Sequence, residues 1–116
     1  ELQALKIGNF FKKNEIKITK VLSSEWCRCK DTAKIAFGNY ETKNFLNSFY
    51  DERFSKNKDK QILDFQKFIK NWNYSGNLAL VTHYVVISEI LDLATSSGEI
   101  VITDNNLKFL GSLEIN

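Results

Sequence analysis

Two side chains with the chemistry to bind an anion each follow a run of residues typical of a β-strand. The chain has a single histidine, His83, and only two of its 16 Lys and Arg residues are arginines, Arg28 and Arg53. Arg28 follows the β-rich run Ile16 to Leu22, and His83 directly follows the apolar run Leu78 to Thr82. An arginine and an imidazole at the ends of neighbouring strands could together bind one phosphate-like anion.

The position of Arg28 in a predicted helix favours an anion at this place. Arg28 lies in the first turn of a helix expected over residues 25–37. Helical side chains lean toward the N-terminus, so the guanidinium should reach back over the end of the strand. The first-turn N–H groups and the helix dipole attract an anion to the same region. His83 could donate a hydrogen bond to that anion or shuttle a proton.

Other chemistries find little support in the sequence. There is no glycine-rich phosphate loop and no G-x-S-x-G nucleophile motif. Cys27 and Cys29 cannot form a zinc site by themselves, and the only histidine is distant in sequence. We expect free thiols, at least one of them buried, and no metal. A Ser or Cys nucleophile paired with His83 is conceivable, but no spacing supports it.

The apolar spacing divides the chain into alternating helices and strands. Helices are predicted for residues 1–13, 25–37, 59–72 and 84–94. Strands are predicted for residues 16–22, 78–82, 99–103 and 108–115, the last two as a terminal hairpin. Residues 39–58 predict a loop region with one short strand or helical turn. The strand at 78–82 and the helix at 84–94 are so apolar that both are expected to be buried.

Residues suited to helix ends occur at three predicted boundaries. Ser23 and Ser24 offer hydroxyl groups to cap the second helix, and Asp59 could cap the third. Gly38 stands where a glycine commonly ends a helix.

The order of elements predicts one α/β domain spanning residues 1–116. Alternation of this kind indicates an α/β sandwich with a largely parallel sheet and an antiparallel edge hairpin. In a parallel sheet the two strand-to-helix junctions would lie on the same rim, where such folds bind ligands. The chain has no Met and opens in helix-like sequence. We therefore expect a piece of a longer protein that has lost the strand before its first helix.

Composition excludes several classes of protein. A hydrophobic fraction of 43% with 13% aromatic residues is enough for a folded core and excludes disorder. A net charge of +2 is too balanced for a protein that coats nucleic acid. No stretch approaches the ~20 apolar residues of a membrane span. We expect neither nucleic-acid nor membrane partners.

Three segments resemble the histidine phosphatase superfamily, which has the phosphoglycerate-mutase-like fold. Val21 to Ala33 (VLSSEWCRCKDTA) is similar to the family's block of a strand, Ser-Ser, Arg and Thr-Ala. Leu80 to His83 (LVTH) is similar to the block that carries the second histidine, and Ser97 to Ile100 resembles the tail of a phosphatase-like branch. The resemblance implies a three-layer α/β sandwich that binds a phosphorylated small molecule or phosphoprotein without a cofactor.

The resemblance also implies a role for each candidate residue. In the family, a histidine in an Arg-His-Gly or Arg-His-Ala motif after the first strand attacks phosphorus. Arg28 would be the second arginine, His83 the second histidine, and Ser24 would lie near the phosphate pocket. Asp51 or Glu52 would protonate the leaving group, although either could equally be a solvated turn carboxylate.

The sequence departs from the family pattern in ways that remove the nucleophile. The Arg-His-Gly motif and the first strand are absent, and Tyr84 replaces the glycine that commonly follows the second histidine. We therefore expect a truncated phosphatase domain without phosphohistidine turnover. The alternative is a non-catalytic module that binds phosphate or another anion, or a partner, on the same scaffold. A sheet lacking a middle strand should also dimerise, exchange an element or repack.

Overall fold

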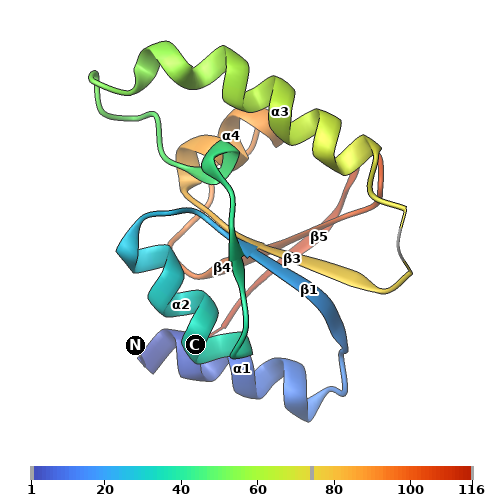
Figure 1. Ribbon diagram of the computed structural model, residues 1–116. Helices are drawn as coiled ribbons and strands as arrows, with labels where there is room; N and C mark the ends of the chain where they lie inside the picture. Colours follow the sequence, from blue (N-terminus) through green and yellow to red (C-terminus); the bar gives the residue numbers. More distant parts are fainter. Residues whose placement is uncertain (1, 74, 116) are drawn as a thin grey trace.

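The computed structural model describes residues 2–73 and 75–115 and has a mixed α/β architecture (Figure 1). Its helices are α1 (Leu2–Lys13), α2 (Cys27–Phe37), α3 (Lys58–Lys70) and α4 (Tyr84–Leu91), with short 3-10 helices at Asn44–Leu46 and Ser55–Asn57. Its strands are β1 (Ile18–Ser23), β2 (Glu41–Thr42), β3 (Asn77–Val81), β4 (Glu99–Thr103) and β5 (Phe109–Glu114). The predicted α/β class is confirmed, and so are the parallel strands and the terminal hairpin.

In the part of the chain that the structure describes, the strands form two separate sheets. A parallel sheet has the order β2-β1-β3, and the antiparallel pair β4-β5 forms a second sheet. The sequence predicted the hairpin as the edge of the parallel sheet, and this part of the prediction is wrong for the described residues. Helices α1 and α2 lie on one side of the parallel strands, and α3 and α4 lie on the other (Figure 1).

The pairing of β1 with β3 aligns the two strand-to-helix junctions. Ser23 lies opposite Val81 in the parallel register. One residue later, the Ser24 N–H donates to the Val81 carbonyl at 2.9 Å. Both strands therefore end at the same level, which confirms that the two junctions share one rim of the sheet.

The main core lies between the parallel sheet and α3. Leu22, Leu46 and Val86 are fully buried. Around them pack Phe45, Phe49, Phe65 and Ile69, also buried, from the long loop and α3. Thr82 Oγ1 donates to the Leu46 carbonyl at 2.6 Å, which ties the long loop to the end of β3. The core thus fixes the loop beside the rim where the candidate residues lie.

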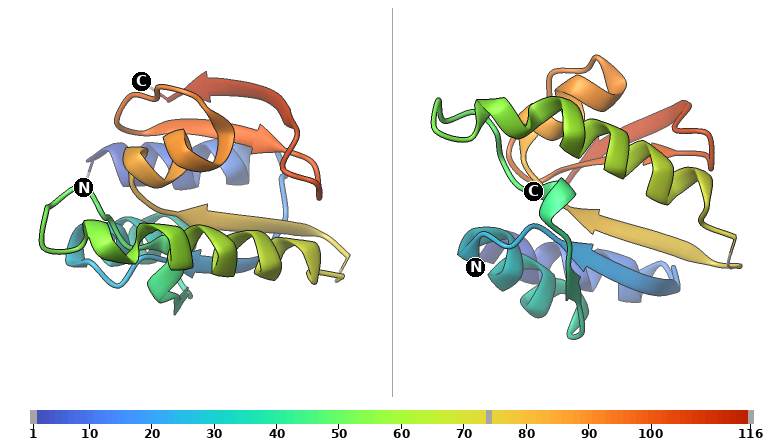
Figure 2. Two further views of the ribbon diagram at one scale, coloured as in Figure 1. Left: turned by 90° about the horizontal axis from the view of Figure 1, so that it is seen from above. Right: turned by 45° about the horizontal axis from the view of Figure 1, so that its top comes forward.

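A cavity of about 1000 Å³ separates the two sheets. Its walls include every residue of β3 and of β4, together with residues of α1 and α4. Within the described chain, β3 pairs only with β1 and β4 pairs only with β5, so the strand edges that face the cavity are unpaired. Figure 2 shows β3 and β4 as separate strands that lie apart from each other.

The cavity makes two elements less buried than their sequences predict. In α4 only Val86 is buried, and Tyr84 is 56% exposed. In β3 the four residues from Leu78 to Val81 are half-buried. Both predictions of full burial are wrong because one side of each element faces the cavity. The helix also ends earlier than expected, at Leu91, where Asp92 has a left-handed backbone conformation with φ of 56°.

The predicted helix caps are right at one boundary and wrong at two. Gly38 ends α2 with φ of 88°, and its N–H donates to the Lys34 carbonyl, as expected from a glycine at this position. Neither Ser24 nor Asp59 caps a helix, because α2 begins after Trp26 and α3 after Asn57, with no capping side chain at either. The Ser24 hydroxyl is instead part of the candidate site.

Helices α1 and α2 approach closely at a glycine, which gives a test of this packing. A Cβ atom on Gly8 would lie 2.6 Å from the Ala36 carbonyl oxygen. We expect Gly8→Ala to lower the free energy of unfolding by about 1–2 kcal/mol, because the overpacking outweighs the gain in helix propensity. Gly111→Ala is the control, since apart from Gly111 and its two chain neighbours no described residue has an atom within 4 Å of the Cβ position. Urea unfolding of both variants measures the difference, and equal stabilities would contradict the close packing.

Candidate functional site

The rim formed by the ends of β1 and β3 brings the two leading candidates to one cavity. Arg28, in the first turn of α2, and His83, between β3 and α4, both line the cavity of about 1000 Å³. Trp26 and Thr82 line the same wall. The guanidinium and the imidazole therefore both border one large space near the aligned strand ends.

His83 is buried and held on several sides. Its side chain is only 9% exposed, and its Nε2 atom lies 2.9 Å from Ser24 Oγ. The Cys29 Sγ atom is 3.6 Å from the same nitrogen. The Trp26 ring packs edge-on against the imidazole, with 4.9 Å between ring centroids. These contacts fix the orientation of the ring.

The hydrogen bonds of Ser24 indicate which nitrogen of His83 carries the proton. Ser24 Oγ donates to Asn47 Oδ1 at 3.1 Å and accepts the Trp26 N–H at 3.1 Å. A hydroxyl has one proton, and Ser24 uses it in the hydrogen bond that it donates to Asn47. The hydrogen bond between Ser24 and His83 must therefore be donated by the Nε2–H group of His83. Asn47 is itself oriented by Glu25, whose N–H donates to Oδ1 at 2.8 Å and whose carboxylate accepts from Nδ2 at 2.8 Å.

This arrangement leaves the Nδ1 atom of His83 for a ligand. Among the described residues no side chain or backbone group hydrogen-bonds to Nδ1, while no buried side-chain nitrogen or oxygen lacks a partner. Nδ1 is therefore open to solvent, and the cavity that His83 lines gives it that access. In the protonated ring, Nε2–H would still donate to Ser24 and Nδ1–H could donate to an anion.

Arg28 faces this site without a neutralising partner. Its side chain is exposed and makes no ion pair within residues 2–73 and 75–115. Arg53, the other arginine, pairs with Asp51 at 3.0 Å. The pKa of His83 is lowered, first by burial and then by the positive charge of Arg28. The guanidinium is therefore close enough to disfavour protonation of the imidazole, and an anion bound near both groups would offset this effect.

The structure distinguishes the two carboxylates proposed from the sequence. Asp51 lines the same cavity as Arg28 and His83, whereas Glu52 is exposed and does not line it. The side chain of Arg53 hydrogen-bonds Asp51 and holds the pKa of that carboxyl below its usual range. Asp51 is thus better placed than Glu52 to act as an acid, but a carboxyl with this lowered pKa is ionised at neutral pH.

The cysteines do not form a nucleophilic site with His83. Both are free thiols; Cys27 is exposed and Cys29 is buried, as expected for at least one of them. Burial raises the pKa of the Cys29 thiol, although Ser24 and Arg28 act in the opposite direction. Cys29 donates to the Thr82 carbonyl at 3.7 Å and remains protonated. Its contact with His83 is therefore packing and weak hydrogen bonding.

Sequence reasoning missed three residues that shape the site. Trp26, Cys29 and Asn47 all contact His83 or its partner Ser24. Trp26 and Cys29 flank Arg28 closely in the sequence, so a helix drawn from Ser24 onward could have placed them beside it. Asn47 lies in an irregular loop, and no periodic signal predicts where its side chain points.

Neither a metal-ligand cluster among the described residues nor a matching family identifies what the chain does. Among the described residues, no three His, Cys, Asp or Glu side chains gather as a metal site. No helix in the same ranges is both long and apolar enough to cross a membrane. No family model matches the sequence, and no curated protein matches it.

The effect of the Arg28 charge on the protonation of His83 can be measured on the single histidine. Arg28→Gln removes the positive charge, so we expect the pKa of His83 to rise while burial still holds it below its ordinary value. NMR titration of the imidazole resonances gives this pKa directly. Arg53→Gln is the matched control, because Arg53 is engaged with Asp51 and should leave the histidine unchanged. An unchanged pKa in Arg28→Gln would place the guanidinium away from His83.

Proposed function

We propose that this chain is the phosphate-binding part of a phosphomonoester phosphatase that works through a phosphohistidine intermediate. The observation that supports this most is the unneutralised Arg28 beside His83 at the aligned ends of two parallel strands. Phosphate is tetrahedral and carries negative charge, and it suits a guanidinium fork combined with an imidazole donor. The sequence blocks around Arg28 and His83 resemble those of the histidine phosphatase superfamily.

Within this proposal each residue of the rim has a defined task. Arg28 binds two phosphate oxygens, and the Nδ1–H of protonated His83 donates to a third. Ser24 acts as a positioning residue, because its hydroxyl is engaged by His83, Asn47 and Trp26 and is fully buried. The bound anion favours the imidazolium form, so His83 takes up a proton as the ligand binds.

The nucleophile comes from a strand that the 116 residues do not contain. The cavity borders the whole of β3 and β4, and both facing edges lack partners within the described chain. A strand between them, parallel to β3, would pair both edges and join the sheets into the central layer of a three-layer sandwich. An Arg-His-Gly motif at its carboxyl end would then emerge at the rim beside His83.

The chemistry follows from this placement. The added histidine nitrogen attacks phosphorus as the bond to the leaving oxygen breaks, and Asp51, if released from Arg53 and protonated, gives that oxygen its proton. Water then attacks the phosphohistidine and releases inorganic phosphate. Arg28 and His83 stabilise the charge on the transferred oxygens in both steps.

Binding of inorganic phosphate tests the anion site without requiring turnover. We expect phosphate to raise the pKa of His83, because an anion stabilises the charged ring. Arg28→Gln should weaken phosphate binding about tenfold or more, the usual loss of a charge-assisted pair. NMR of the single histidine and calorimetry both report the affinity, and Arg53→Gln should bind as the parent does. A histidine that does not respond to millimolar phosphate would refute the site.

Supplying the missing strand tests the catalytic part of the proposal. We expect the 116-residue chain to be inactive on p-nitrophenyl phosphate. A form extended at its N-terminus by an apolar strand ending in Arg-His-Gly should gain hydrolysis and trap a phosphohistidine, detectable by mass spectrometry at alkaline pH. The same extension with Arg-Asn-Gly is the control and should stay inactive. Activity that is equal in the two extended forms would refute the phosphohistidine mechanism.

The second candidate function is a non-catalytic module that binds phosphate with the same rim. It is favoured by the state of Asp51, whose pKa the Arg53 contact lowers still further below neutrality, so that this carboxyl is a poor proton donor at neutral pH. Phosphate binding without gain of activity in the extended form would favour it. In either case the unpaired edges of β3 and β4 could instead pair with a second copy, and solution scattering would reveal such a dimer.

A further inference from the structure

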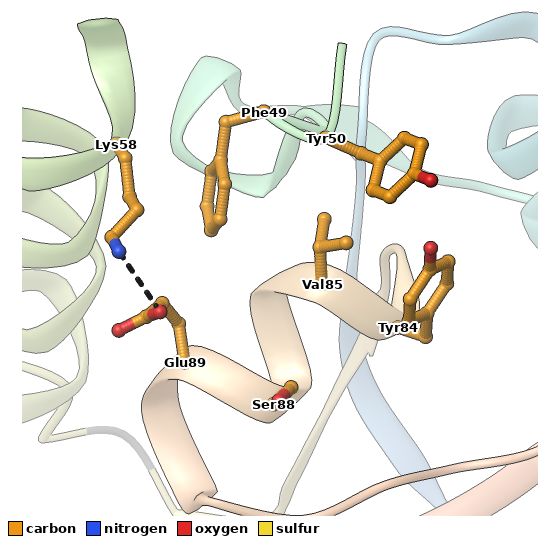
Figure 3. Close-up of a pocket in the computed structure, with 7 residues that line it drawn as sticks. All are labelled: Phe49, Tyr50, Lys58, Tyr84, Val85, Ser88 and Glu89. Carbon is orange, nitrogen blue, oxygen red and sulfur yellow. Dashed lines mark ion pairs between the residues drawn. The ribbon is translucent and has the colours of Figure 1, made fainter. Parts of the chain in front are cut away.

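Two exposed tyrosines stand between the candidate phosphate site and a second, smaller pocket. Tyr50 and Tyr84 are 74% and 56% exposed, and their ring centroids lie 6.1 Å apart. Both line the large cavity and also a shallow pocket of about 280 Å³. Figure 3 shows their rings side by side at one end of this pocket.

The sequence positions of the two tyrosines tie the pocket to the site. Tyr84 directly follows His83, and Tyr50 directly precedes Asp51. Both tyrosines also border the large cavity that His83 and Asp51 line. A leaving group attached to a phosphate at the rim would extend between these two residues and into the pocket.

The rest of the pocket favours an uncharged, apolar occupant. Phe49 and Val85 line its middle in Figure 3. At the far end Lys58 is paired with Glu89 at 3.0 Å, so its charge is already neutralised. A second phosphate or carboxylate would find no free cation among these lining residues. The pocket volume of about 280 Å³ exceeds the roughly 150 Å³ of an enclosed cavity that holds benzene, so it has room for a single aromatic ring.

We propose that this pocket is the leaving-group subsite and that the site prefers monoesters of phenolic hydroxyls, that is, aryl phosphates. The ring lies against Tyr50 and Tyr84 in stacked or edge-on contact, with Phe49 and Val85 beneath it. This inference rests on the proposed phosphate site and adds the class of substrate to it. A phenolic monoester also has a better leaving group than an alkyl ester, which suits a site whose acid, Asp51, is held ionised.

Three probes separate this inference from the function on which it rests. The affinities of inorganic phosphate, methyl phosphate and phenyl phosphate are measured on the 116-residue chain through the His83 resonances. We expect phenyl phosphate to bind about tenfold more tightly than methyl phosphate, because one favourable contact between aromatic rings contributes about that much to the affinity. If inorganic and methyl phosphate do not bind, the anion site is absent and both proposals are refuted. If they bind and phenyl phosphate binds no more tightly, only the aryl preference is refuted.

Substitutions of the two tyrosines test whether the preference for phenyl phosphate arises in this pocket. In Tyr50→Ala and in Tyr84→Ala the ratio of methyl to phenyl dissociation constants should fall toward one. Tyr40→Ala is the matched control, because Tyr40 is an exposed tyrosine that lines neither space, and it should keep the ratio. A ratio that survives both pocket variants would overturn the assignment of the ring to this pocket.

A phosphotyrosine peptide identifies the source of the aryl phosphate. If the peptide binds more tightly than phenyl phosphate, the substrate is a protein. If the two bind equally tightly, the substrate is a small molecule.

Discussion

The parallel pairing of β1 with β3 is the constraint on which the candidate site depends. It places Ser23 opposite Val81 and lets the next backbone N–H, that of Ser24, bond across the strand ends. That bond brings the Ser24 hydroxyl to His83, which is 59 residues away in the chain. Arg28 follows on the same rim because α2 starts directly after this turn. A shift of one residue in the register would turn these side chains to opposite faces.

The electrostatics of the rim suit a site that becomes charged when a ligand arrives. His83 is buried but neutral, and its hydrogen bond to Ser24 satisfies one ring nitrogen at little cost. Arg28 keeps its charge in water, where it needs no partner. The same charge discourages protonation of His83 until an anion compensates it. The contrast with Arg53, which is already paired with Asp51, explains why only one arginine is available.

The cavity between the sheets connects the fold to the proposed function. Among the residues that the structure describes, it leaves the facing edges of β3 and β4 unpaired, and it accounts for the partial exposure of β3 and α4 despite their apolar sequences. The apolar residues of β3 and α4 are typical of a buried central strand and a buried helix, but here they are only partly buried. An added strand would bury both elements, satisfy both edges and bring its own side chains to the rim beside His83 and Arg28.

The sequence alone determined the kinds of element, their order and the residues at the strand ends. Apolar periodicity carries that information locally, so β1, α2, β3 and the hairpin β4-β5 could be predicted to within a few residues. It also singled out Arg28 and His83, because both are rare and both follow strands. Only the tertiary structure decided that the hairpin forms its own sheet and that Asn47 and Trp26 hold Ser24. It also decided that Asp51, not Glu52, faces the cavity. These outcomes depend on contacts between segments far apart in the chain and on loop conformations, which no local pattern of residues encodes.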